Sequence, residues 1–176
     1  MKNLIKAIAI VAVIFFSAGV ANAQQKLGHI NSGDILQAMP EVKTADASFE
    51  AFRQTKLSEL EAMDKERQAK IVTFQDKYKT LTNENQATLG PELEALNQEI
   101  QTIEQRINDA DQKAQNDLAQ KREELYKPIL DKVGNAINAV AKEQGFAYIF
   151  DIVNQAVVYF EGGQDVTPLV KTKLGL

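Results

Sequence analysis

The fold of this chain is decided by residues 49–81, which read FEAFRQTKLSELEAMDKERQAKIVTFQDKYKTL. Apolar side chains recur in this stretch at spacings of three and four, the period of one face of an α-helix. Charged and polar residues fill most of the other positions, and no Gly or Pro interrupts them. The stretch therefore predicts one long amphipathic helix. Its apolar seam consists of Phe49, Phe52, Leu60, Met63, Ile71, Phe74, Tyr78 and Leu81.

A second amphipathic stretch, residues 93–129, mirrors the first in the order of its apolar positions. Folding the chain at Thr88–Leu89 places Leu81 near Leu96, Tyr78 near Ile100 and Phe49 near Ile129, so the two seams match along their length. An antiparallel helical hairpin requires this mirror, because each apolar side chain must meet a partner at its own height. At 1.5 Å per residue, arms of about 45 residues would be roughly 65 Å long.

The predicted hairpin arm occupies residues 41–144, and its tip is expected at residues 87–91. Gly90 would end the first helix and Pro91 would open the second, the positions that these residues prefer. Pro128 lies inside the second helix, where it removes a backbone donor. We therefore expect Pro128 to kink the arm near its root and to act as a hinge.

The first 23 residues have the pattern of a secretory signal peptide. Lys2 and Lys6 precede an apolar run at residues 7–16, and Ala21-Asn22-Ala23 has the small-residue form of a cleavage site. The run is short for a membrane span, although an uncleaved anchor is the alternative. The sequence thus predicts export to the periplasm and no stable membrane insertion after cleavage.

Composition argues against several classes of function. The chain has 20 Lys and Arg against 24 Asp and Glu, so it lacks the basic footprint that nucleic-acid binding requires. It contains no Cys, and its single histidine, His29, lies inside a predicted strand. The carboxylates are dispersed along helix faces and have no metal-ligand spacing. We predict that the protein is not an enzyme and needs no cofactor or metal.

The two ends of the exported chain predict a small β body. Residues 24–40 read as a strand and a short helix, and residues 145–176 as a β-hairpin and a terminal helix. The hairpin would pair residues 146–153 with 156–160 through a turn at Asn154-Gln155. The predicted fold class is α+β, mostly α. Because so few strands with apolar residues on both faces make a poor independent domain, we expect other copies to complete the body, a monomer being the alternative.

Several motifs, in this order and spacing, together resemble the Skp (OmpH-like) family of periplasmic chaperones. After the first strand and before the hairpin, the motifs are Asn31-Ser32-Gly33-Asp34-Ile35-Leu36 and Met39-Pro40-Glu41. After the hairpin, they are Pro128-Ile129, Gly145-Phe146, Asp151 with Val157-Val158-Tyr159, and Asp165-Val166-Thr167. The resemblance implies a homotrimer whose hairpin arms enclose a cavity, which holds unfolded outer-membrane proteins without ATP.

This reading assigns two sets of candidate contact residues. The trimer body would use Ile30, Phe146, Tyr148, Phe150, Val158 and Phe160. Unfolded clients would contact apolar residues outside the arm seam, namely Leu57, Ala62, Val72, Leu89, Ala119 and Tyr126. Family members are basic at their arm tips, whereas residues 75–105 here hold two lysines and six acids. This acidic segment would favour basic clients.

A different class of function fits the same hairpin. An exported coiled-coil spacer or adaptor would dock to one folded partner in the cell envelope and ignore unfolded chains. Binding of several unrelated unfolded proteins would distinguish the chaperone from the spacer.

Overall fold

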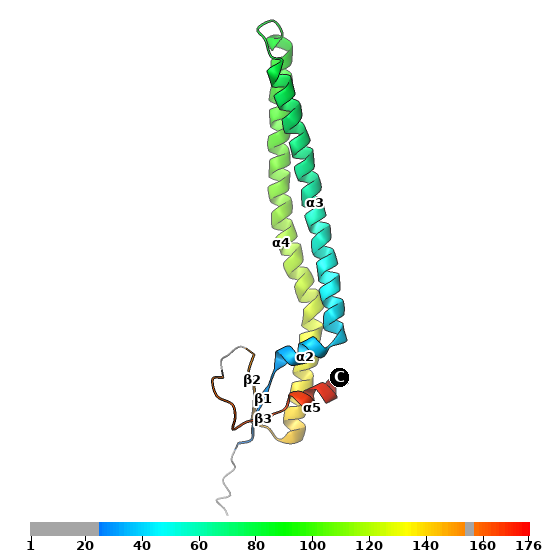
Figure 1. The fold of residues 1–176 in the computed structure, drawn as a ribbon, viewed down its shortest axis with the longest axis vertical. Helices are drawn as coiled ribbons and strands as arrows, with labels where there is room; N and C mark the ends of the chain where they lie inside the picture. The colour runs from blue at the N-terminus through cyan, green and yellow to red at the C-terminus, as the bar shows by residue number, and fades with distance from the viewer. Residues whose placement is uncertain (1–24, 154–156) are drawn as a thin grey trace, which may run out of the picture. The chain divides into compact units, whose positions relative to one another are not determined.

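The computed structural model describes residues 25–153 and 157–176 (Figure 1). The predicted α+β, mostly helical fold is confirmed. The predicted signal peptide at residues 1–23 and the predicted turn at Asn154-Gln155 lie outside the described residues. In chain order, the elements are β1 (Leu27–Ile30), α2 (Ser32–Ala38), α3 (Pro40–Lys79), α4 (Gln86–Gln144), β2 (Tyr148–Asp151), β3 (Gln164–Asp165) and α5 (Thr167–Leu174).

The chain divides into two compact units. The arm unit comprises residues 35–135, and the sheet unit comprises residues 25–34 and 136–175. The sheet unit thus includes the last turns of α4, which the sequence assigned to the arm. Val140 is buried there, and Lys26 donates a hydrogen bond from Nζ to the Gln144 carbonyl at 3.1 Å. Gly145 ends the helix with φ of 71°, as its position predicts.

The arm unit is built from α3 and α4, which lie side by side and antiparallel in Figure 1. Proline at the start of α3 suits the first turn of a helix, where no backbone donor is lost. Seam residues such as Leu93, Ile103 and Ala114 are buried. The predicted helical hairpin is therefore present.

The turn of the hairpin lies before the predicted position. The chain leaves α3 after Lys79 and enters α4 at Gln86, so residues 87–91, including Gly90 and Pro91, are helical. Asn85 organises this turn: its Oδ1 accepts from Thr82 N–H at 2.7 Å, and its Nδ2 donates to the Thr80 carbonyl at 2.8 Å. The predicted tip at 87–91 is wrong because the bonds of Asn85 place the turn earlier in the chain, and Gly90 and Pro91 lie inside α4.

The facing register shifts with the turn. Lys77 Nζ lies 2.6 Å from Glu92 Oε2, and Lys70 Nζ lies 2.6 Å from Glu99 Oε2. The predicted register placed Tyr78 near Ile100, about two helical turns away from this arrangement. Both seams repeat every three to four residues, so they still match after such a slide. The apolar pattern thus predicts that the helices pair, and the turn decides where.

The sheet unit holds three parallel strands in the order β2-β1-β3. Leu27 pairs with Tyr148, and Gly28 pairs with Gln164. The predicted second strand of the hairpin is not formed over residues 157–160. Instead the chain turns, with Gly163 N–H donating to the Phe160 carbonyl at 2.9 Å, and the next two residues pair with the open edge of β1. Pairing at that edge satisfies the backbone groups of β1.

Two side chains connect distant parts of the sheet unit. Asp151 Oδ2 accepts from Ser32 Oγ at 2.5 Å, which joins the end of β2 to the start of α2. Thr167 Oγ1 accepts from Asn31 N–H at 2.9 Å, which joins α5 to the end of β1. Val166 and Val170 are fully buried beside these bonds and help to fill the core.

Candidate functional site

The arm unit presents its predicted client-contact residues in two groups. Leu57, Ala62, Val72 and Ala119 are exposed, and Val72 exposes 53% of its surface. Leu89 and Tyr126 are only half-buried. The exposed group lies apart along two helices rather than in one patch, so each residue offers a small separate contact.

Tyr126 has a structural contact of its own. Its hydroxyl donates a short hydrogen bond to Asp46 Oδ1, from α4 to α3, and the guanidinium of Arg122 lies 5.9 Å from its ring. The hydrogen bond to Asp46, with burial, raises the pKa of the Tyr126 phenol. This half-buried side chain therefore connects α4 to α3.

The sequence missed two exposed apolar side chains of the arm. Tyr78, which the repeat assigned to the seam, is 60% exposed and stacks on Phe74 with ring centroids 6.1 Å apart. Leu130 is 53% exposed on α4. Tyr78 lies one residue before the end of α3, next to the turn at residues 80–85.

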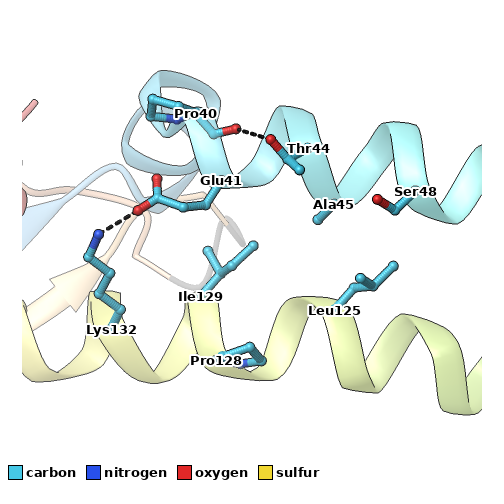
Figure 2. Close-up of a pocket in the computed structure, with 9 residues that line it drawn as sticks. All are labelled: Pro40, Glu41, Thr44, Ala45, Ser48, Leu125, Pro128, Ile129 and Lys132. Carbon is cyan, nitrogen blue, oxygen red and sulfur yellow. Dashed lines mark hydrogen bonds and ion pairs between the residues drawn. The ribbon is translucent and has the colours of Figure 1, made fainter.

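A groove lies at the base of the arm, between the start of α3 and α4 (Figure 2). It is a shallow groove that is open to solvent, with a volume of about 500 Å³. Ile129 and Leu125 point from α4 toward α3, and an ion pair of 2.5 Å between Lys132 and Glu41 crosses it. The lining residues are Pro40, Glu41, Thr44, Ala45, Ser48, Leu125, Pro128, Ile129 and Lys132.

Charged side chains along the arm are largely paired. Glu50 accepts bonds from Arg53 and Gln54, and these bonds lower the pKa of its carboxyl to about 2. Lys56 lies 3.0 Å from Asp117 in the other helix, with 16% and 26% of their side chains exposed. The Lys56 ammonium is thus partly buried between the two helices with an opposite charge beside it, which offsets the cost of removing it from water.

The sheet unit presents most of the residues predicted for assembly. Tyr148, Phe150, Val158 and Phe160 are exposed, and Val158 exposes 95% of its surface. Ile30 and Phe146 are buried within one chain instead. The Phe146 ring lies under the Lys26 ammonium at 4.1 Å and close against Gly28. These two residues therefore fill the core of the unit.

A second groove of about 500 Å³ runs beside β1 in the sheet unit. Leu27, Phe150 and Phe160 line it together with His29. The His29 ring lies 4.8 Å from the Phe160 ring, and its buried Nδ1 has no hydrogen-bond partner among the described residues. The lining of this groove is mostly apolar, and Leu27, Phe150 and Phe160 are exposed in the part of the chain that the structure describes.

The described residues contain no group of three or more His, Asp or Glu side chains able to hold a metal ion. Within residues 25–153 and 157–176, none of the helices combines the length and the apolar character needed to cross a bilayer.

A long helical hairpin with scattered exposed apolar side chains and a small three-stranded sheet unit define an α+β protein with a hairpin arm. The family model described as "Outer membrane protein (OmpH-like)" matches residues 26–174. The chain therefore belongs to the OmpH-like family.

Proteins similar to this chain include two named Chaperone protein Skp. The one from Photorhabdus luminescens is 28% identical over 170 residues, covering 97% of each chain. The one from Vibrio cholerae is 26% identical over 154 residues, covering 86% of this chain and 87% of that protein. A crystal structure of an OmpH-like protein from Caulobacter crescentus matches with a TM-score of 0.66 at 16% identity, over 88% of this chain and 86% of that one. This last likeness supports the fold.

Proposed function

We propose that this protein is a periplasmic holdase chaperone that binds unfolded outer-membrane proteins and prevents their aggregation without ATP. Membership of the OmpH-like family supports this proposal, as does the likeness to proteins named Chaperone protein Skp. The observation that carries it is the arm surface. Exposed Leu57, Val72 and Leu130 are dispersed among charged residues along a long hairpin.

Dispersed contacts suit a holdase for a physical reason. Each apolar contact is weak, but an unfolded chain can make many of them at once, and their combined effect gives avidity. Because each contact breaks separately, the client can leave without an energy source. A spacer that docks to one folded partner would instead need a contiguous, complementary patch.

The protein is proposed to act as a homotrimer. Four exposed apolar residues of the sheet unit, Tyr148, Phe150, Val158 and Phe160, would meet the same unit of neighbouring copies. In a trimer the arms of three copies would enclose a cavity for one client. No nucleic-acid partner is proposed, because the net charge of −4 would repel phosphates.

The test is light scattering after a urea-unfolded outer-membrane β-barrel protein is diluted into buffer with the protein present. We expect scattering to be suppressed without nucleotide, with saturation near three chains per client. A soluble protein that refolds without aggregation serves as the control for client binding. Unchanged scattering at several-fold excess, for clients of either charge, would instead favour the spacer.

A further inference from the structure

The groove at the base of the arm has a mostly apolar lining, and the proposed function does not assign it a ligand. α3 contributes short side chains, Ala45 and Ser48, opposite Leu125 and Ile129 of α4 (Figure 2). In a closely packed hairpin, larger side chains would fill this level of the seam. The short side chains leave about 500 Å³ open.

The two charged groups that line the groove and the Thr44 hydroxyl already have partners. Glu41 and Lys132 form an ion pair at 2.5 Å, and hydrogen bonding to Lys132 lowers the pKa of the Glu41 carboxyl. The Thr44 hydroxyl donates to the Pro40 carbonyl at 3.2 Å, which leaves its methyl group free to face a ligand. A charged ligand group would therefore lose water against Leu125 and Ile129, while the two charged groups that line the groove are already paired with each other. The groove is therefore better suited to a neutral, apolar group than to a charged one.

The size of the groove indicates whether its ligand is a single side chain or the surface of another protein. Nine residues line it. A stable protein interface uses roughly 20 to 30 residues on each side, so the groove alone would not hold a second copy of the chain. It is large enough for one bulky side chain with part of its backbone. An aromatic ring is the apolar group that gains most here, since it buries about 150–250 Å².

Two proline rings favour an aromatic ring over an aliphatic group. Pro40 and Pro128 line the groove from different helices. Their C–H edges carry a small positive charge, whereas the face of an aromatic ring is negative. A Phe or Tyr ring can therefore contact one of these edges with its face while its rim meets Leu125 or Ile129.

We propose that this groove binds one aromatic side chain of an unfolded, extended client segment. The proposal deepens the proposed function, on which it rests, by naming the part of the client that is held. Strands of outer-membrane β-barrels alternate apolar and polar residues and carry aromatic residues at both membrane interfaces. Such segments would offer a ring to the groove at regular intervals while the charged arms keep the chain in solution.

The first experiment measures the NMR chemical shift of an Ile129 methyl group while peptides are added to protein produced from the full coding sequence. The probes are short Ser/Gly peptides that differ only in one central residue, which is Phe, Ala or Lys. We expect the Phe peptide to shift the Ile129 signal in a saturable way, and the Ala and Lys peptides to leave it in place. Equal shifts with all three peptides would overturn the proposal.

Two matched variants locate the site. Ser48→Leu fills the groove from an exposed position of α3, and Ser58→Leu adds the same side chain to an exposed position outside the groove. We expect Ser48→Leu to weaken binding of the Phe peptide about tenfold and Ser58→Leu to leave it unchanged. Circular dichroism checks that both variants keep the helical arm. Equal affinity in the two variants would place the ring elsewhere and overturn the proposal.

Two further measurements distinguish this proposal from binding of a second copy and from the holdase proposal on which it rests. If Ser48→Leu changes the oligomeric mass measured by light scattering, the groove holds a second copy, and the proposal is overturned. Suppression of client aggregation is measured on the same proteins. If the native chain suppresses aggregation but the Phe peptide does not shift the Ile129 signal, the groove proposal is overturned and the holdase proposal stands. If the peptide shifts the signal in a saturable way but aggregation is not suppressed, the holdase proposal is overturned and binding of an aromatic ring in the groove stands.

Discussion

Asp151 shows how much one carboxylate can organise in the sheet unit. It accepts from the Ser32 hydroxyl at 2.5 Å, from Ser32 N–H at 3.2 Å and from Val153 N–H at 3.2 Å. Burial raises the pKa of this carboxyl, but the three hydrogen bonds outweigh burial, and the net pKa is lowered. The charged form is therefore the one that holds β2 to α2.

We expect Asp151→Asn to destabilise the sheet unit by about 2 kcal/mol, because an amide cannot accept all three bonds. Urea unfolding, with amide exchange of β1 as a local readout, measures the change. Asp131→Asn is the control, since Asp131 meets only the exposed Lys127 at 3.0 Å and should cost less than about 0.5 kcal/mol. Similar losses in both variants would show that the Asp151 bonds contribute little.

The same carboxylates make the sheet unit sensitive to acid. The pKa of Asp165 is also lowered, since bonds from Thr167 together with the nearby His29 and Lys171 outweigh the effect of burial. A carboxyl whose pKa is lower in the folded state contributes stability above its unfolded pKa, near 4, and loses it as pH falls through the folded value. We expect unfolding free energy to be constant from neutral pH down to about 5 and then to fall. In Asp151→Asn the fall below about pH 4 should be shallower, and an unchanged slope would contradict this account.

The turn between α3 and α4 is the element that fixes the arm register. Asn85 accepts from Thr82 N–H and donates to the Thr80 carbonyl, and its own carbonyl accepts from Leu89 N–H at 2.8 Å. We expect Asn85→Ala to destabilise the arm by about 1 kcal/mol, because the two side-chain bonds to Thr82 and Thr80 that hold the turn are lost. Asn83→Ala, in the same turn, should have a smaller effect. Thermal unfolding followed by circular dichroism compares the two, and the prediction fails if Asn83→Ala costs as much.

The sequence predicts which segments are helical better than it predicts how they meet. The three-and-four spacing of Phe49 to Leu81 requires a buried face, so the existence of α3 follows from it. The position of the turn does not follow from the sequence. Gly90 and Pro91 are the stronger turn signal there, whereas the bonds of the Asn85 side chain can be seen only in the folded chain. Burial of Phe146 depends in the same way on its contact with Gly28 and Lys26. The groove at the arm base arises from a register that the sequence placed incorrectly.

Pro128 lies within α4 and lines the groove at the arm base. A proline there removes one backbone hydrogen bond, so the helix should bend more easily at this point. The hinge stays a prediction. We expect Pro128→Ala to narrow the distribution of distances between spin labels in the arm unit, one on α3 and one on α4. Lys127→Ala is the control, and equal distributions in the native chain and Pro128→Ala would contradict the hinge.

The two units differ in how their exposed apolar side chains are arranged: those of the arm are scattered among charged residues, and those of the sheet unit lie around β1 and β2. The arm carries cross-helix ion pairs, such as Lys70 with Glu99 and Lys77 with Glu92, which keep its surface hydrated. Its segment 75–105 holds six acids against two lysines. The sheet unit instead exposes aromatic and aliphatic side chains around β1 and β2. This difference favours a protein that associates through one unit and keeps a client in solution through the other.

Association between copies of the chain is expected to depend on the surface around Val158. Val158 is 95% exposed beside a groove lined by Leu27, Phe150 and Phe160, and an apolar group with that exposure gains most when another copy covers it. If the protein forms the proposed trimer, we expect Val158→Asp to convert it to a monomer, because burying a carboxylate against apolar side chains without a partner is costly. Val72→Asp, an equivalent change on the arm, should keep the native mass. Light scattering coupled to size exclusion reads the mass, and circular dichroism checks that both variants remain folded. An unchanged mass in folded Val158→Asp would move the assembly face away from this surface.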